Sequence, residues 1–205
     1  MNDIDKRIRK YTELYRKALI KKQLADTEGK SASYEKRLRE MYESEAYKNH
    51  NVYPTMNVEL IYAVIAMCLE LKGFGFSNQE IMDFSDIVFE KRKKFFTVLE
   101  KAVGVLPGTY KIAEKWNIDD HEKRVRDGSI TYDSFDVQDG RIEYRISGCR
   151  YVDMFEYYGI RPLCRIFCKT DTAAYSQLTR SVKFTRYSDL SDGDSCHDVI
   201  ERIGK

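Results

Sequence analysis

The first hundred residues carry apolar side chains at intervals of three or four, which is the period of an amphipathic helix. One such segment covers residues 3–25, and a second runs from Tyr34 to Tyr42 after a polar break at 27–31. Both segments are otherwise strongly charged and hold no cluster of reactive groups. We therefore expect residues 1–50 to form a helical extension that serves packing or joins two copies of the chain in a homodimer.

The next segment is apolar on nearly every face, which predicts a central core helix from Val58 to Leu71. Asn57 suits the N-terminal cap of this helix, and Gly73 suits its C-terminal cap. The residues Ser77-Asn78-Gln79-Glu80 then have the form of a capping box, in which the serine and glutamate side chains each bond a free N–H. This box predicts a second long helix that continues to Ala102.

The period changes to two in the second half of the chain. Residues 135–137 and 142–146 alternate between apolar and polar around Asp139-Gly140, a pair typical of tight β-hairpins. Two more strands are predicted at 182–187 and 196–203, joined by a polar turn rich in serine, aspartate and glycine. These four segments together predict a small antiparallel sheet.

Helices are predicted between the two pairs of strands, at 151–158 and from Pro162 to Thr179. A helical N-terminal half packed with a small antiparallel sheet and two helices in the C-terminal half is an α+β fold. A chain of 205 residues can form one domain, so we predict a single domain over 1–205. Its expected parts are the extension at 1–50, a helical core at 51–125, and the sheet with a reactive cluster at 126–205.

The composition is that of a folded protein, because 42% of the residues are hydrophobic and 13% are aromatic. The formal net charge of +2 gives no global field that would favour nucleic acid or an anionic membrane. The basic run Lys91–Lys94 is bracketed by apolar residues at helical spacing, which indicates a solvated helix face. We find no secretory signal and no apolar run of membrane-spanning length. We therefore expect a cytoplasmic protein without nucleic-acid or membrane partners.

Four of the five cysteines lie between Cys149 and Cys196, interleaved with carboxylates, arginines and a histidine. Cys149 follows Gly148 at the predicted junction of a strand and a helix. A thiol at a helix N-terminus beside Arg150 should have a lowered pKa and a larger fraction of reactive thiolate. The alternative is a structural cysteine that closes the turn.

A second group of candidates shares one stripe of the helix that follows Pro162. Cys164, Cys168, Asp171 and Tyr175 recur at intervals of four, three and four, beside a stripe of apolar residues. A purely apolar packing face would not need an aspartate, so Asp171 is a candidate base, substrate anchor or partner of Arg186. A structural aspartate paired with arginine is an equally open interpretation.

The end of the chain argues against a metal centre. Cys196 and His197 are neighbours on a predicted strand, so their side chains point to opposite faces of the sheet. Only one of them can face the helix that carries Cys168. The sequence also lacks any paired C-x2-C motif. We therefore expect neither a bound metal nor a cofactor.

At these residues the chain resembles the L-2-amino-thiazoline-4-carboxylic acid hydrolase family. The matching elements are Gly148-Cys149 after a strand, the aromatic helix Tyr151 to Tyr158 with its Gly159-Ile160-Arg161-Pro162 exit, Phe167-Cys168-Lys169-Thr170-Asp171, and Arg186 followed by Gly193-Asp194-Ser195-Cys196. The resemblance implies a hydrolase that opens a cyclic amidine-like ring at a C–N bond in a small carboxylate substrate.

Such a reaction needs a nucleophile, a group that moves protons, and a cation that holds the substrate carboxylate. We predict Cys149 or Cys168 as the nucleophile, Asp171 as the acid/base and Arg186 as the carboxylate clamp. Cys196, His197 and Tyr175 complete the predicted substrate-binding set. The final strand–turn–strand is also similar to 4-vinyl-reductase-like domains, which predicts the alternative of a domain that binds a small molecule without catalysis. A third interpretation makes all these groups core packing.

Overall fold

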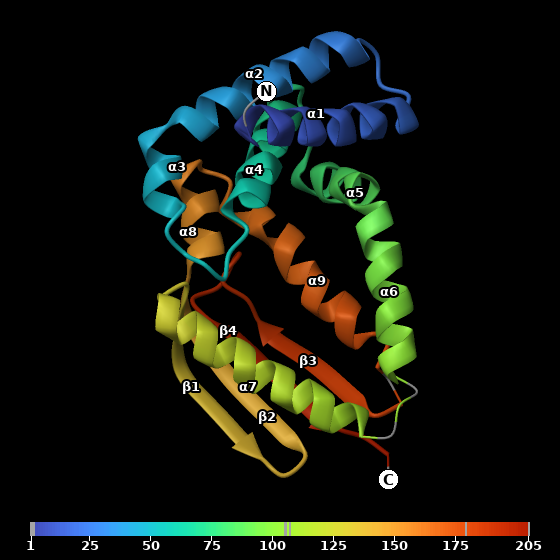
Figure 1. The fold of residues 1–205 in the computed structure, drawn as a ribbon, viewed down its shortest axis with the longest axis vertical. Coiled ribbons are helices and arrows are strands. Elements are labelled where there is room, and N and C mark those ends of the chain that lie inside the picture. The colour runs from blue at the N-terminus through green and yellow to red at the C-terminus, as the bar shows by residue number, and fades with distance from the viewer. Residues whose placement is uncertain (1–2, 105, 107, 179, 205) are drawn as a thin grey trace. The chain divides into compact units, whose positions relative to one another are not determined.

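A computed structural model describes residues 3–104, 106, 108–178 and 180–204 (Figure 1). The side chains of 91–93, 95, 96, 99 and 100 also lie outside the described part, so the expected solvated face at Lys91–Lys94 stays a prediction. The chain divides into two compact units, Met1–Glu90 and Lys91–Lys205. The predicted single domain, with its boundaries at 50 and 125, likewise stays a prediction.

The first unit is helical. Its helices are α1 (Asp3–Lys21), α2 (Thr27–Glu43), α3 (Glu45–His50), α4 (Val58–Gly73) and α5 (Asn78–Val88). The predicted core helix is confirmed as α4, which is buried on nearly every face and contacts both α2 and α5. Tyr15 of α1 stacks on Tyr34 of α2 with ring centroids 4.5 Å apart, and both side chains are buried. The helices at the start of the chain therefore form part of this unit's core.

The predicted N-terminal caps are confirmed, but the C-terminal cap predicted at Gly73 is wrong. Gly73 is the last residue of α4, Phe74 takes the cap position, and Gly75 is the glycine at positive φ. Two helix boundaries also differ from the prediction. The Asn57 side chain accepts from the N–H of Leu60, and Ser77 and Glu80 form the expected capping box. The polar break at 27–31 is instead the first turn of α2, because Asp26 adopts a left-handed conformation and its carboxylate caps the new helix. The long helix expected after Ser77 is interrupted at Phe89, where α5 ends and α6 (Glu90–Gly104) begins.

The second unit combines helices with a four-stranded sheet, and the predicted α+β class is confirmed. Its further elements are α7 (Thr109–Asp127), β1 (Ile130–Gln138), β2 (Arg141–Cys149), α8 (Arg150–Tyr157), the 3-10 helix η1 (Arg161–Cys164), α9 (Arg165–Tyr175), β3 (Val182–Ser188) and β4 (Cys196–Arg202). The strands pair antiparallel in the order β1-β2-β4-β3. The predicted hairpin at Asp139-Gly140 joins β1 to β2, with Gly140 at positive φ.

Two helices cover one face of this sheet. Figure 1 shows α7 crossing in front of the strands, and both α7 and α9 contact β3. The core between helices and sheet contains Tyr110 and Ala113 of α7 together with Ile142, Val182 and Ile200 of the strands. The sequence predicts a short helix around Trp116 followed by a polar stretch at 121–127, and the structure instead includes that stretch in α7. Polar residues on the inner side of α7 therefore face the sheet.

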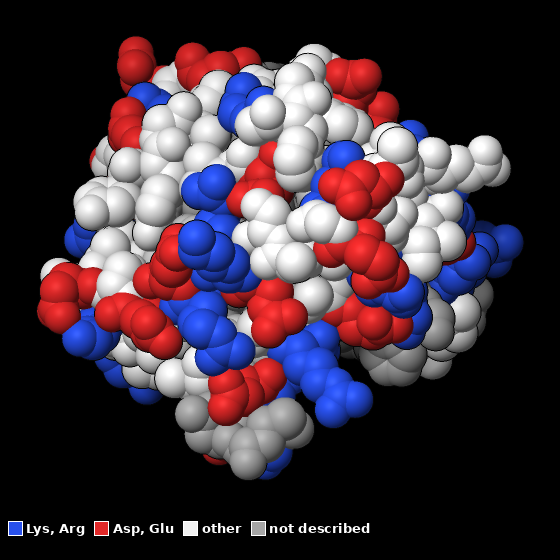
Figure 2. Space-filling model, turned by 90° about the horizontal axis from the view of Figure 1, so that it is seen from above, with Lys and Arg blue, Asp and Glu red and all other residues white. Residues whose placement is uncertain are grey.

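Charged side chains of both signs are interspersed over the face drawn in Figure 2. Many charged residues of the described chain form ion pairs, such as Arg16 with Glu28 and Arg39 with Asp5. Among the described residues, no helix is long and apolar enough to cross a membrane.

Candidate functional site

The centre of the candidate site is an ion pair between neighbouring strands. Arg186 of β3 lies opposite Asp198 of β4 in the register of the sheet. Its Nε donates to Oδ1 and its Nη2 donates to Oδ2, both at 2.7 Å. Burial opposes the charge on Arg186, but these bonds to Asp198 raise the pKa of the guanidinium above its usual range. Asp198 is only 1% exposed. An unpaired carboxylate at such a position would be strongly destabilising, so the pairing with Arg186 allows Asp198 to be buried.

The same guanidinium connects the sheet to α9. Its Nη1 donates to the backbone carbonyl of Cys168 at 3.1 Å, and its Nη2 donates to Oδ2 of Asp171 at 3.2 Å. Cys168 and Asp171 lie on adjacent turns of α9, as their spacing predicts. One arginine thus fixes the position of the candidate thiol and of the candidate carboxylate. The role of Arg186 as a carboxylate clamp stays a prediction, because these partners occupy most of its donors.

Asp171 is surrounded by groups that respond to its charge. Burial raises the pKa of four neighbouring tyrosines, and the Asp171 charge adds a smaller rise to each. They are Tyr132, Tyr144, Tyr151 and Tyr175. The side chain of Asp171 is nevertheless 53% exposed, so solvent reaches the centre of this group. Desolvation raises the pKa of Asp171, and the charge of Arg186 opposes that shift.

Cys168 is the candidate thiol with the strongest activation. Its interaction with the Cys164 thiol, together with the charge of Arg186, lowers the pKa of Cys168 although burial opposes the shift. The same interaction, with burial, raises the pKa of Cys164. Cys164 is fully buried, whereas Cys168 is partly exposed. Cys168 is therefore the member of this pair with the lowered pKa and the exposed surface, which makes it the better candidate nucleophile.

The prediction of a lowered pKa for Cys149 is wrong. Burial raises the pKa of Cys149 to about 11, against a smaller lowering by the N–H groups of Val152 and Tyr151 in the first turn of α8. The neighbouring Arg150 points elsewhere, since its Nη1 donates to Asp153 at 2.7 Å. Desolvation by the packed sheet and helices outweighs the local effect of the helix terminus. Cys149 still lies close enough to Cys168 for their charges to interact.

Two of the predicted binding residues lie at the edge of the same group. Cys196 is buried at the start of β4, accepts from the backbone N–H of Leu190 at 3.3 Å, and lies within electrostatic range of Arg186. Burial raises the pKa of Cys196 to about 12, which keeps it a neutral thiol. Tyr175 stacks on Phe184 with centroids 4.7 Å apart, and its hydroxyl accepts from Asn117 at 2.7 Å.

His197 lies on the opposite face of the sheet from Arg186 and Asp198. Its Nε2 contacts Oε1 of Glu143 at 2.7 Å, and its ring stacks on Tyr187 at 4.8 Å. This placement follows from the alternation along β4, where Cys196 and Asp198 face the helices. The structure therefore brings together six of the seven predicted site residues and separates His197 from them.

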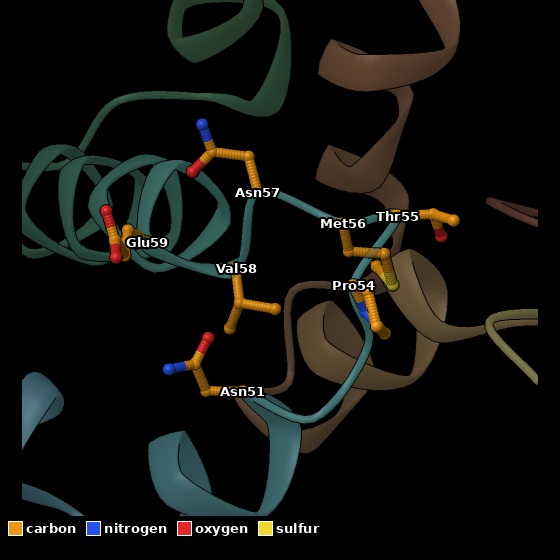
Figure 3. Close-up of a pocket in the computed structure, with 7 residues that line it drawn as sticks. All are labelled: Asn51, Pro54, Thr55, Met56, Asn57, Val58 and Glu59. Atoms are coloured by element: carbon orange, nitrogen blue, oxygen red, sulfur yellow. The ribbon is translucent and has the colours of Figure 1, made fainter. Parts of the chain in front are cut away.

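Neither a metal site nor a described pocket coincides with this group. No set of three or more His, Cys, Asp or Glu side chains among the described residues is placed to hold a metal ion. Figure 3 shows a pocket in the segment that joins α3 to α4, within the first unit. Its volume is about 400 Å³. Its lining residues are Asn51, Pro54, Thr55, Met56, Asn57, Val58 and Glu59, none of which is a predicted site residue.

The site contains residues that the sequence did not single out. Asp198 is one of them, and its position directly across from Arg186 depends on the strand register. The others come from α7, whose inner stripe at intervals of four and three contains Asn117, His121 and Arg124. His121 stacks on Phe135 with centroids 3.9 Å apart, and burial lowers its pKa. The spacing of these three polar residues is helical, and it predicts the full helix once the polar stripe is assigned to the buried side.

Residues 58–199 match the model of the L-2-amino-thiazoline-4-carboxylic acid hydrolase family. The matched region contains every predicted site residue and extends well before the segment on which the resemblance rested. The chain belongs to this family. Searches of curated proteins and of solved structures found no match.

Proposed function

We propose that this protein is a hydrolase that opens the ring of a small cyclic amidine carboxylate, of the kind named by its family, at a C–N bond. The observation that carries the proposal is the placement of Cys168 and Asp171 on one face of α9, both held by Arg186. These two groups lie one helical turn apart, so both can reach one bond of the substrate. The thiol can act as nucleophile at the carbon of that bond, and the accessible carboxylate can move protons at its nitrogen.

The proposed reaction begins with the Cys168 thiolate. Its sulfur adds to the ring carbon of the amidinium, between nitrogen and sulfur, and the C=N electron pair moves to the ring nitrogen. Protonated Asp171 then gives its proton to that nitrogen, the C–N bond breaks, and the nitrogen leaves as an amine. The lowered pKa of Cys168 favours the first step, and the raised pKa of Asp171 favours the second.

Water completes the cycle. The Asp171 carboxylate takes a proton from water, and the hydroxide adds to the carbon that is bonded to the Cys168 sulfur. Collapse of this adduct forms a carbonyl and expels the thiolate, and one proton passes to the amine product. The sum is the addition of one water molecule across the C–N bond, with both side chains restored. Cys149 and Cys196, as neutral thiols, contribute to the walls of the site in this scheme.

The proposal is tested by incubating the purified protein with L-2-amino-thiazoline-4-carboxylate and following ring opening by mass spectrometry. We expect Cys168→Ser and Asp171→Asn each to reduce turnover by about a hundredfold or more. Cys68→Ala in the first unit and Asp139→Asn in the hairpin serve as matched controls and should retain turnover. Binding without turnover by the wild type would support the alternative, a small-molecule-binding domain. Full activity of both site variants would overturn the proposed roles.

A further inference from the structure

The inner face of α7 presents a second arginine to the candidate site. Arg124 lies in the last turns of α7, and its side chain is 18% exposed. Its Nε donates to Oδ2 of Asp120 at 2.5 Å, and its guanidinium also interacts with the hydroxyl of Tyr151. Its Nη1 is buried and has no hydrogen-bond partner among the described residues. A buried N–H donor on a cation is costly to leave unsatisfied, so this atom is available for an acceptor.

Contacts of α7 with α9 place that donor on the side of the reactive groups. Asn117, on the same stripe of α7 as Arg124, donates to the Tyr175 hydroxyl of α9 at 2.7 Å. The Tyr151 ring, whose hydroxyl interacts with Arg124, lies 5.2 Å from the ring of Phe167, the residue before Cys168.

The charge of Arg124 acts on Cys149 and on Asp171, and it lowers the pKa of Tyr132 and Tyr151 against the larger effect of their burial. Both tyrosines therefore remain neutral hydroxyls next to the guanidinium. A cation flanked by neutral hydroxyls is a suitable environment for a small anion.

The other arginines near the site are committed to protein carboxylates. Arg186 binds Asp198 through two donors and Asp171 through a third. Arg165 also has a buried Nε without a partner, but its guanidinium lies between Asp189 and Asp192 at 3.1 and 2.9 Å. Among the described residues, Arg124 pairs with one carboxylate, that of Asp120, whose side chain is 53% exposed. Only the Nε of Arg124 donates to it. Its charge is thus the least neutralised of the three.

We propose that Nη1 of Arg124 binds the carboxylate of the substrate, while Arg186 positions Cys168 and Asp171. The proposal rests on the proposed function for the identity of the anion, and on the buried donor for its location. The two arginines thus have different roles, substrate binding for Arg124 and positioning for Arg186. Most donors of Arg186 bond protein groups, and Arg124 retains a buried donor for a ligand.

The test measures binding and not turnover. L-thiazolidine-4-carboxylate and its uncharged carboxamide are titrated calorimetrically into the wild type, Arg124→Gln and Arg126→Gln. Arg126 is a matched control because it is exposed on the same helix, two residues away. We expect the wild type and Arg126→Gln to bind the carboxylate about tenfold to a hundredfold more tightly than the carboxamide. Arg124→Gln should bind the two compounds equally.

A second measurement uses the wild type alone, so that it does not depend on the folding of a variant. Phenylglyoxal modifies accessible arginines, and peptide mass spectrometry reports the rate at each position. The carboxylate should slow modification of Arg124 and leave that of Arg126 unchanged, and the carboxamide should protect neither. Retention of the carboxylate preference by Arg124→Gln, or no protection of Arg124, would overturn this inference and leave the hydrolase proposal intact. Absence of any preference in the wild type would contradict both.

Discussion

Removal of the Arg186 charge should destabilise the second unit far more than removal of an exposed arginine from the same sheet. Arg186→Met leaves Asp198, which is 1% exposed, without its two hydrogen bonds of 2.7 Å. Breaking one partner of a buried ion pair costs about 3–5 kcal/mol, because the remaining charge is desolvated and unpaired. The matched control is Arg202→Met, whose pair with Asp139 is largely exposed and should contribute less than about 1 kcal/mol.

Urea denaturation followed by tryptophan fluorescence measures this difference. Trp116, the single tryptophan, lies on α7 and therefore reports on the second unit. The double variant Arg186→Met/Asp198→Leu should recover most of the lost free energy, since it removes both charges together. A loss below about 1 kcal/mol for Arg186→Met, or no recovery in the double variant, would refute the structural role given to this pair.

Three further predictions test other parts of the account. Iodoacetamide should alkylate Cys168 faster than Cys149, and buried Cys68 should react last. As the pH is raised, the Cys168 rate should reach its plateau at a lower pH than the Cys149 rate, because the pKa of Cys168 is lowered and that of Cys149 is raised to about 11. Equal rates across the pH range would contradict the assignment of the thiolate. His197→Gln should leave turnover within about twofold, because its side chain lies on the other face of the sheet; a larger loss in steady-state assays would return it to the site. Ser77→Ala should lower the free energy of unfolding by about 1 kcal/mol in urea, through loss of the capping box, and no change would show that the cap is dispensable.

The fold was predictable where the signal is local. The capping box at Ser77 and the Asp139-Gly140 hairpin act over a few residues, and both are present as predicted. The start of α2 was missed because Asp26 caps it from a left-handed conformation, which the residue type permits and does not require. The extent of α7 was missed because its inner face is polar where it meets the site.

The candidate site shows the same division between local and long-range effects. The stripe that joins Cys168 to Asp171 follows from helical spacing alone. The pairing of Arg186 with Asp198 depends on the register between two strands, including an irregularity after Arg186 that the sequence does not reveal. The raised pKa of Cys149 depends on burial by residues distant in the chain, which reverses the expectation from the helix terminus.

The central claim is that the Cys168 thiolate attacks the substrate with Asp171 as its proton shuttle, and rapid-quench mass spectrometry tests it most directly. The wild type is mixed with L-2-amino-thiazoline-4-carboxylate, quenched in acid during the first turnover, and digested. The account predicts a transient mass increase equal to the bound substrate on the peptide that contains Cys168. It also predicts that Cys168→Ser forms no such adduct and that Cys149→Ser still does. Ring opening by the wild type without any adduct, or an adduct on Cys149 alone, would contradict the claim.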